Sequence, residues 1–307
     1  MGLDIGGTTM LAVLCDRELN IVDQISAATP AREGNGAMAA CALALARALL
    51  ERNDCVLSAL GVGAAGVIDR ESGTVVTASD SFVGWAGTPL GPLLASGLGI
   101  PVVLENDVNA FLAGEMAAGA ARNRQHVLGI TLGTGVGGAV AFDGHIIHGA
   151  HGAAGEIGHI PGFGNDPCTC GQRGHLETLA SGRSISRRYF QRSGRSRTAR
   201  DIAGAARLGD ADAGQVFSDA GQGVARGILM AAGLADISAA VIGGGVAHAW
   251  DLLSPAMEEV LANEPPVNGH VIAVRRSALG HQAVAVGACA SALSSLGELP
   301  VPSATRH

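Results

Sequence analysis

MGLDIGGTTMLAVLCD, residues 1–16, opens the chain, and HVLGITLGTGVGGAVAF, residues 126–142, repeats its design. Each stretch reads as an apolar strand, a turn of glycine and threonine, and a second apolar strand. A single glycine-rich run is weak evidence of function, but two copies between apolar strands are stronger. The repeat predicts two related α/β lobes, each beginning with a β-hairpin.

The turns of both hairpins suit phosphate binding. Glycine lets a backbone approach a ligand closely, so backbone amides can surround a phosphate, and an aspartate at the strand end can lie near the accompanying cation. No G-K-[ST] sequence follows, so neither turn is a Walker motif. Plain hairpin turns are the alternative interpretation. The candidate residues are Asp4, Gly6, Gly7, Thr8, Thr9, Gly133, Thr134 and Gly135.

A carboxylate stands where a strand is expected to meet a helix, in PVVLENDVN, residues 101–109. The apolar strand at 102–104 runs into Glu105, Asn106 and Asp107, and a helix follows. Ligands collect at the carboxyl ends of strands in open α/β sheets, and another apolar strand ends just before Gly66. Asp107 is therefore our candidate general base; a helix-capping role is the alternative.

The most unusual stretch is HGAAGEIGHIPGFGNDPCTCGQRGHLE, residues 151–177. Cys168 and Cys170, in C-x-C spacing, are suited to hold one metal ion, with histidines on both sides to complete the site. We expect the metal to fix this loop so that polar side chains converge on a polyhydroxylated ligand. A metal-free glycine-rich turn is the alternative. The converging side chains would be those of Glu156, His159 and Glu177.

Composition narrows the class of protein. The 307 residues are 48% hydrophobic and only 15% charged, which excludes a disordered chain, and the formal net charge of -7 argues against a general nucleic-acid binder. It does not argue against nucleotide binding, which uses local backbone amides. With 46 glycines and 3% aromatics, we expect ligand sites lined by backbone. The first motif starts almost at Met1 and no long unbroken apolar run follows, so we expect a cytoplasmic protein with no membrane partner.

The last part of the chain reads mainly as helices, at 181–192, 201–208, 212–234 and 283–296. The basic run at Arg183, Arg187, Arg188 and Arg192 is most simply a solvated helix face. A buried strand at 239–242 ends in three glycines before another helix. Those glycines are suited either to hold the base or ribose of a nucleotide or to form a tight turn. They are Gly243, Gly244 and Gly245.

Together, these motifs resemble those of the ROK family of bacterial sugar kinases and sugar-responsive repressors, in order and over nearly the whole chain. The segments that carry the resemblance are DIGGT (4–8), END (105–107), LGTGVGG (132–138), EIGH (156–159), CTCGQRG (168–174), LE (176–177) and IGGG (242–245). The resemblance implies the two-lobed actin-like, ribonuclease-H-like fold, with a cleft between the lobes. It also implies ATP-dependent phosphorylation of a hexose.

Carried over position by position, the resemblance implies a role for each motif. Asp107 would be the catalytic base, and the glycine turns at 6–8 and 133–135 would hold the phosphates of ATP with Mg²⁺ nearby. Residues 243–245 would hold adenosine. Sugar contacts would come from Gly66, Asn106, Glu156, His159 and Glu177.

A structural zinc ion is also implied, but the chain departs from the family pattern there. His175 stands where the third cysteine is usual. Histidine is a good zinc ligand, so we expect a Cys2His2 site. Its ligands would be His159, Cys168, Cys170 and His175.

The remaining expectations concern organisation and substrate. We predict a small lobe at 1–108, joined by the terminal helix at about 283–307, and a large lobe at 109–282. Phosphorylation at O6 of glucose ranks first; kinases for allose or an N-acetylated hexosamine and a catalytically silent sugar-binding regulator are alternatives. The sequence leaves the donor open between ATP and polyphosphate. Family members are often dimers or tetramers, so we expect a homo-oligomer. Only three residues precede Asp4, too few for the helix-turn-helix segment that the family's repressors carry there, so we expect no nucleic-acid partner.

Overall fold

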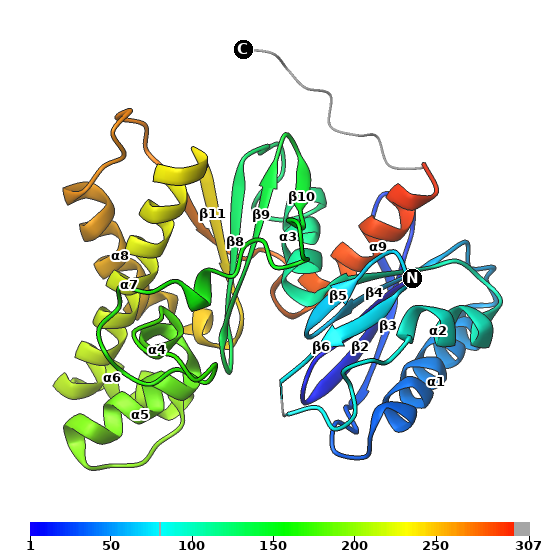
Figure 1. The fold of residues 1–307 in the computed structure, drawn as a ribbon, viewed down its shortest axis with the longest axis horizontal. Coiled ribbons are helices and arrows are strands. Elements are labelled where there is room, and N and C mark those ends of the chain that lie inside the picture. The colour runs from blue at the N-terminus through cyan, green and yellow to red at the C-terminus, as the bar shows by residue number, and fades with distance from the viewer. Residues whose placement is uncertain (80, 298–307) are drawn as a thin grey trace. The chain divides into compact units, whose positions relative to one another are not determined.

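The computed structural model describes residues 1–79 and 81–297 and divides into two compact units, each with its own sheet (Figure 1). The first unit contains Met1–Asn123, Phe142–Ala154 and the described residues from Ala278 onward. The second unit contains Arg124–Ala141 and Gly155–Ser277.

The first unit is built on a five-stranded sheet of order β3-β2-β1-β4-β7. Strands β1 to β3 form an antiparallel meander, whereas β1, β4 and β7 run parallel. Helices α1 and α2 pack on one face of this sheet and α3 and α9 on the other (Figure 1). The elements are β1 (Gly2–Ile5), β2 (Thr9–Cys15), β3 (Ile21–Ala28), α1 (Asn35–Asn53), β4 (Leu60–Ala64), a small hairpin of β5 (Val67–Asp69) and β6 (Thr74–Thr77), α2 (Leu90–Leu98), β7 (Val102–Asn106), α3 (Asp107–Ala117), η3 (Gly280–Gln282) and α9 (Ala283–Ser295).

Glycines let α9 lie unusually close to its neighbours. A Cβ added at Gly61 of β4 would lie 1.8 Å from the carbonyl oxygen of Ala288. One added at Gly287 would lie 1.7 Å from the carbonyl oxygen of Ala110, on α3. No side chain fits between these backbones, so part of the high glycine content serves packing in addition to turns.

The second sheet has the order β10-β9-β8-β11-β12, with β8 and β9 antiparallel and β8, β11 and β12 parallel. This repeats the arrangement of the first sheet, and the repeat predicted from the two hairpins is thereby confirmed. The strands are β8 (Val127–Leu132), β9 (Val136–Phe142), β10 (His145–Ile147), β11 (Ala239–Gly243) and β12 (Ala273–Arg276).

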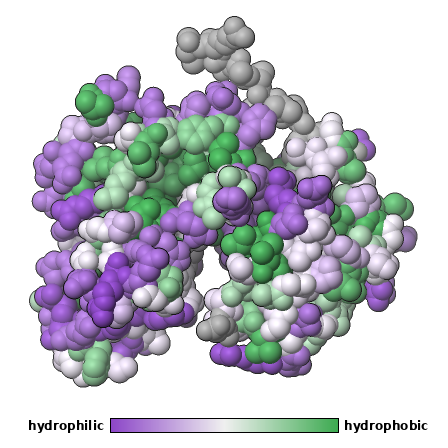
Figure 2. All heavy atoms as spheres, viewed as in Figure 1, coloured by the Kyte–Doolittle hydropathy of each residue, from purple (hydrophilic) through white to green (hydrophobic). Residues whose placement is uncertain are grey.

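Helices of the second unit enclose one large apolar core against β8 and β11. On the face shown in Figure 2, hydrophilic residues cover much of this helical region. No helix in the described ranges is long and apolar enough to span a bilayer. The helical segments are η1 (Ile157–His159), α4 (Glu177–Ala180), α5 (Gly182–Ser193), α6 (Ala199–Arg207), α7 (Ala211–Ala235), η2 (Gly245–Ala249) and α8 (Trp250–Asn263).

The compact units divide the chain differently from the predicted lobes. Helix α3 lies with the first unit, because its small residues pack directly against α9. Residues 142–154 also lie with the first unit, although we expected them in the large lobe. The part of the expected terminal segment beyond residue 297 lies outside the described residues. The expected strands and helices are present, with ends shifted by a few residues.

Candidate active site and metal centre

Asn106 and Asp107 lie where β7 hands over to α3, as the sequence predicts. Asn106 is the N-cap: its side-chain oxygen accepts hydrogen bonds from the backbone amides of Val108 (2.9 Å) and Asn109 (3.1 Å). Its amide group donates to the Asp107 carboxylate (3.1 Å) and to the Gly66 carbonyl (3.0 Å). The capping role that we considered for Asp107 therefore belongs to Asn106, and Asp107 is the first helical residue.

Gly66 is required at its position by backbone geometry. Its φ is +118°, and an added Cβ would lie 2.2 Å from the Thr77 carbonyl oxygen. The hydrogen bond from Asn106 to this glycine joins the start of the β5–β6 hairpin to the start of α3. Three of the predicted sugar-side residues, Gly66, Asn106 and Asp107, are thus brought together within the first unit.

Asp4 lies on β1, opposite Gly63 of the neighbouring parallel strand β4. Burial, and then the negative charge of Asp107, raise the pKa of the Asp4 carboxyl to about 7. The two carboxyl groups are therefore close enough to influence each other. A cation beside them would relieve this repulsion, and magnesium prefers carboxylate oxygens.

The turn after Asp4 leaves its polar groups accessible. The amide of Gly6 donates to the Thr9 carbonyl (3.2 Å), which closes the turn. The Thr29 hydroxyl donates to the Gly6 carbonyl (2.7 Å) and fixes the turn to the end of β3. Gly7, Thr8 and Thr9 are exposed. The turn is thus rigidly held while its outer edge is open to a ligand.

The corresponding turn of the second unit lies beside the triple glycine that ends β11. The Gly133 amide donates to the Gly135 carbonyl (2.9 Å) within the turn. Gly244 has a φ of +86°, and an added Cβ would lie 2.5 Å from the Leu132 carbonyl oxygen. The predicted phosphate turn and the predicted adenosine segment, Gly243–Gly245, are therefore neighbours within one unit, as a single nucleotide site requires.

A cavity of about 1010 Å³ opens at this place in the second unit. Gly133, Thr134 and Gly245 line it, together with the first turns of α5 and α6 and residues of η2. Gly135, Gly243 and Gly244 do not line it.

The cavity also carries arginines that sequence reasoning did not assign to a site. Arg183, Arg197 and Arg200 line it and make no ion pair with any described residue. By contrast, the Arg187, Arg188 and Arg192 side chains on the same helix as Arg183 pair with aspartates. The basic run that we interpreted as a solvated face therefore has one member turned to a cavity.

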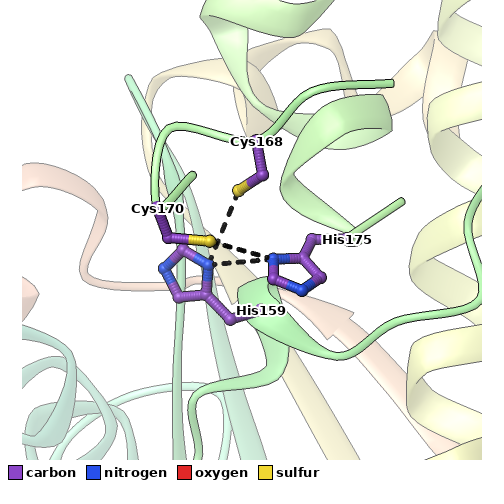
Figure 3. Close-up of side chains that lie close together, drawn as sticks. All are labelled: His159, Cys168, Cys170 and His175. Carbon is purple, nitrogen blue, oxygen red and sulfur yellow. Dashed lines mark hydrogen bonds between the residues drawn. The ribbon is translucent and has the colours of Figure 1, made fainter. Parts of the chain in front are cut away.

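Four metal-binding side chains converge in the second unit, as predicted (Figure 3). His159 comes from η1, the two cysteines from one loop, and His175 from the segment before α4. One nitrogen or sulfur atom from each residue lies within 4.8 Å of the others. The loop is held by Arg187, which donates to the carbonyls of Pro167 (3.1 Å) and Thr178 (3.2 Å).

The distances between these atoms fit a tetrahedral zinc site. Zinc bonds of about 2.0–2.1 Å to nitrogen and about 2.3 Å to sulfur imply ligand atoms about 3.3–3.8 Å apart. The Nδ1 atoms of His159 and His175 are 3.4 Å apart. The distance from Cys168 Sγ to His159 Nδ1 is 3.7 Å, and from Cys170 Sγ to His175 Nδ1 it is 3.3 Å. The cluster therefore has the composition of a Cys2His2 site, and three of its interatomic distances fit one.

The three polar residues of the loop have different surroundings. Glu156 is exposed, and His159 directs Nδ1 to the cluster, which leaves Nε2 for another partner. Glu177 is buried, and its carboxylate accepts from the Thr169 hydroxyl (2.7 Å) and the Val136 amide (3.1 Å). Glu177 thus joins the loop that carries Cys168 and Cys170 to the start of β9. This link was not predicted from the sequence.

A ROK family profile matches residues 1–294. The chain belongs to the ROK family. Among curated relatives, it is 33% identical to the glucokinase of Thermotoga maritima over 85% of this chain and 86% of that protein. It is 32% identical to the N-acetylmannosamine kinase of Citrobacter koseri over 94% of this chain and 96% of that protein.

Solved structures agree with this assignment. A ROK family glucokinase from Streptomyces griseus, in complex with glucose and AMPPNP, superposes with a TM-score of 0.82 at 30% identity, covering 95% of this chain and 98% of that one. The ROK hexokinase from Thermus thermophilus gives a TM-score of 0.84 at 29% identity, covering 97% and 99%. The predicted two-lobed actin-like ATPase fold is confirmed.

Proposed function

We propose that this protein is an ATP-dependent hexose kinase that phosphorylates O6, with glucose as the first-ranked substrate. The observation that carries the proposal is the position of Asp107. Its carboxylate sits at the first turn of α3 and is held by Asn106 and the Val108 amide. This is a suitable base at the carboxyl edge of a parallel sheet. Two glucokinases among the relatives supply the substrate class.

In this mechanism Asp107 accepts the proton of the sugar's primary hydroxyl. The hydroxyl oxygen attacks the γ-phosphorus of ATP, a new O–P bond forms, the β–γ anhydride bond breaks, and ADP leaves. Phosphoryl transfer depends mainly on positioning and charge stabilisation. Asn106 fixes the orientation of Asp107, because its side-chain amide group donates to one oxygen of the Asp107 carboxylate.

Binding of the nucleotide is assigned to both glycine turns and the cavity of the second unit. The Gly6–Thr9 and Gly133–Gly135 turns offer backbone amides and hydroxyls to phosphates. Gly243–Gly245 provide close backbone approach for the nucleoside. Arg183, Arg197 and Arg200 add positive charge at the cavity that no carboxylate among the described residues pairs with, and guanidinium groups bind phosphate well. We assign ATP as donor on the basis of the relative bound to AMPPNP, an ATP analogue.

The proposed metals have separate roles. Zinc would be held by His159, Cys168, Cys170 and His175, and when bound it supplies a structural crosslink of the loop. Magnesium would be held near Asp4 and the phosphates, where it neutralises charge. In the second unit, the residues best suited to bind sugar hydroxyls are the exposed Glu156 and the outer ring nitrogen of His159.

Coupled measurement of ADP release with a panel of hexoses tests this proposal. Glucose should support turnover, and 6-deoxyglucose should inhibit competitively without being phosphorylated, because it lacks the attacking oxygen. Turnover with 6-deoxyglucose at the rate of glucose would exclude O6 as the acceptor. No ADP release above the sugar-free rate with any hexose would refute the kinase function.

N-acetylmannosamine is the second candidate substrate. A kinase for this sugar matches nearly the full length of the chain at an identity close to that of the glucokinases. Allose also stays in the panel. A catalytically silent regulator is less well supported, because Asp107 and both glycine turns are present. The ratio of kcat/KM values among the three sugars ranks the candidates.

We also propose a cytoplasmic homo-oligomer, a dimer or tetramer. This rests on the family resemblance. Light scattering on purified protein tests the oligomeric state, and a monomer at micromolar concentration would contradict it.

A further inference from the structure

The buried carboxylate of Glu105, close in sequence to the proposed base, has several polar partners. Glu105 is the residue before Asn106 on β7, and only 3% of its surface is exposed. Its position in the sequence did not by itself indicate a role. Burying an ionised carboxylate destabilises the folded state unless the group is paired and hydrogen-bonded. The partners of Glu105 therefore indicate its role.

Each Glu105 oxygen has two polar partners. Oε1 accepts from the backbone amide of Asn106 (2.9 Å) and the side-chain amide of Asn109 (3.1 Å). Oε2 accepts a hydrogen bond from His148 Nε2 (2.8 Å) and forms an ion pair with Arg70, whose Nε lies 3.1 Å away. Both oxygens are thus engaged, by three hydrogen bonds and one ion pair. The residue thus joins three segments: the β7–α3 junction, the turn after β5 and the segment after β10.

The hydrogen bond from Asn109 to Glu105 forms although it leaves another polar atom of Asn109 unsatisfied. The Asn109 side-chain oxygen is buried and has no hydrogen-bond partner among the described residues. An unsatisfied buried acceptor is unfavourable by about 1–3 kcal/mol. The Asn109 side chain nevertheless turns its amide group to Glu105, and the fold retains this contact at the first turn of the helix that carries Asp107.

Glu105 acts on Asp107 through Asn106. The Asn106 backbone is held by Glu105, and the Asn106 side chain caps α3 and donates to the Asp107 carboxylate. The β5 segment is fixed at both ends by the same network, Gly66 by Asn106 and Arg70 by Glu105. We propose that Glu105, anchored by Arg70 and His148, is the positioning residue that orients the Asn106–Asp107 pair for proton transfer.

The electrostatics agree with this geometry. Burial alone would raise the pKa of Glu105, but the hydrogen bond and charge of His148, the Arg70 guanidinium and the Asn109 amide together hold it below its ordinary value. The ionisable groups that face Glu105 are Arg70 and His148; Asn106 and Asn109 are neutral. The network is therefore built for an ionised carboxylate.

Glu105→Gln is the main test, since glutamine keeps the shape but turns one acceptor into a donor. This inference rests on the proposed kinase activity. We expect kcat to fall by about tenfold or more, because small misplacements of a catalytic group are costly, with a smaller change in the KM for sugar. Glu115→Gln is the matched control. Glu115 is buried on α3, the helix that begins with Asp107. Its carboxylate accepts hydrogen bonds from the backbone amides of Ala120, Ala278 and Leu279, away from Asp107. It should lose stability but keep kcat.

A double variant separates positioning from a merely structural role. In an Asp107→Asn background, Glu105→Gln should cause no further fall in kcat, because the group it orients is already gone. The inference would be overturned if the double variant lost kcat by the product of the two single-variant factors. It would also be overturned if the Glu105→Gln single variant kept the wild-type kcat. If Glu105→Gln does not fold, Arg70→Gln and His148→Gln each replace one partner of Oε2, and each should show a smaller loss of kcat that also vanishes in the Asp107→Asn background. Absence of hexose turnover in the wild type would instead refute the proposed function.

Discussion

The proposed base, Asp107, is held in one orientation by its immediate neighbours. One carboxylate oxygen accepts from the Asn106 amide and the Val108 backbone, so the side chain is oriented before substrate binds. Preorganised groups of this kind need no rearrangement during reaction.

Asp107→Asn should lower kcat by about 100- to 10,000-fold, the usual contribution of a general base. Sugar affinity should change little, because asparagine retains the shape and one acceptor oxygen. Steady-state kinetics and calorimetric titration with glucose measure the two effects. Equal turnover in variant and wild type would rule out Asp107 as the base.

Asp4 makes the stability of the protein pH-dependent. Its pKa is about 7 in the folded chain, whereas the unfolded value is 3.8. The folded state therefore binds this proton more tightly, so the stabilisation is complete below about pH 4 and is lost as pH rises through about 7.

Asp4→Asn removes that titration. Without magnesium and nucleotide, the variant should gain stability relative to wild type as pH rises from 5 to 8. Urea unfolding at both values gives the difference in free energy of unfolding. A difference that is the same at pH 5 and pH 8 would contradict the raised pKa.

Among the structural elements, the segment 160–176, which carries three of the four candidate zinc ligands, is long and irregular and has little secondary structure of its own. Between η1 and α4 it contains only one isolated β-bridge, Pro167 to Arg173. A crosslink between His159 and the later ligands would close this segment and restrict its unfolded state.

His175→Ala should reduce zinc content to well below one ion per chain and lower the melting temperature as chelation does. His175→Cys, which restores the usual family ligand, should retain zinc and stability. Elemental analysis and thermal unfolding provide both readouts. Full zinc occupancy in the alanine variant would show that His175 is not a ligand.

Helix α5 carries arginines of two kinds, and the structure separates them. Arg183→Gln should raise the KM for ATP by about fivefold, since an exposed ion pair contributes about 1 kcal/mol or less. Arg192→Gln, on the same helix but paired with Asp212, is the control and should leave that KM unchanged. Equal effects of the two variants would argue against the cavity as the nucleotide site.

For the whole molecule, ligand binding should be visible as stability. A ligand at 100 times its dissociation constant stabilises the folded state by about 2.7 kcal/mol. Saturating glucose should therefore raise the melting temperature by several degrees, whereas L-glucose should not. Thermal unfolding with each sugar checks this, and identical curves would exclude specific glucose binding.

Several features of this protein could be predicted from local sequence patterns alone. The two hairpins, the strand running into Asp107 and the cluster of two cysteines and two histidines are each encoded by residues close in sequence. Alternation, helical spacing and C-x-C spacing reflect contacts between near neighbours, and such contacts depend little on the rest of the fold.

Only the tertiary structure decided which partners distant residues would find. Glu105 meets His148 across 43 positions, and Glu177 meets Val136 across 41. Nothing in the local sequence distinguishes Arg183 from the paired Arg187, and the place of α3 in the first unit depends on the close approach of α3 to α9 at Gly287. These contacts arise when whole sheets and helices pack together, because packing brings residues together regardless of their separation along the chain.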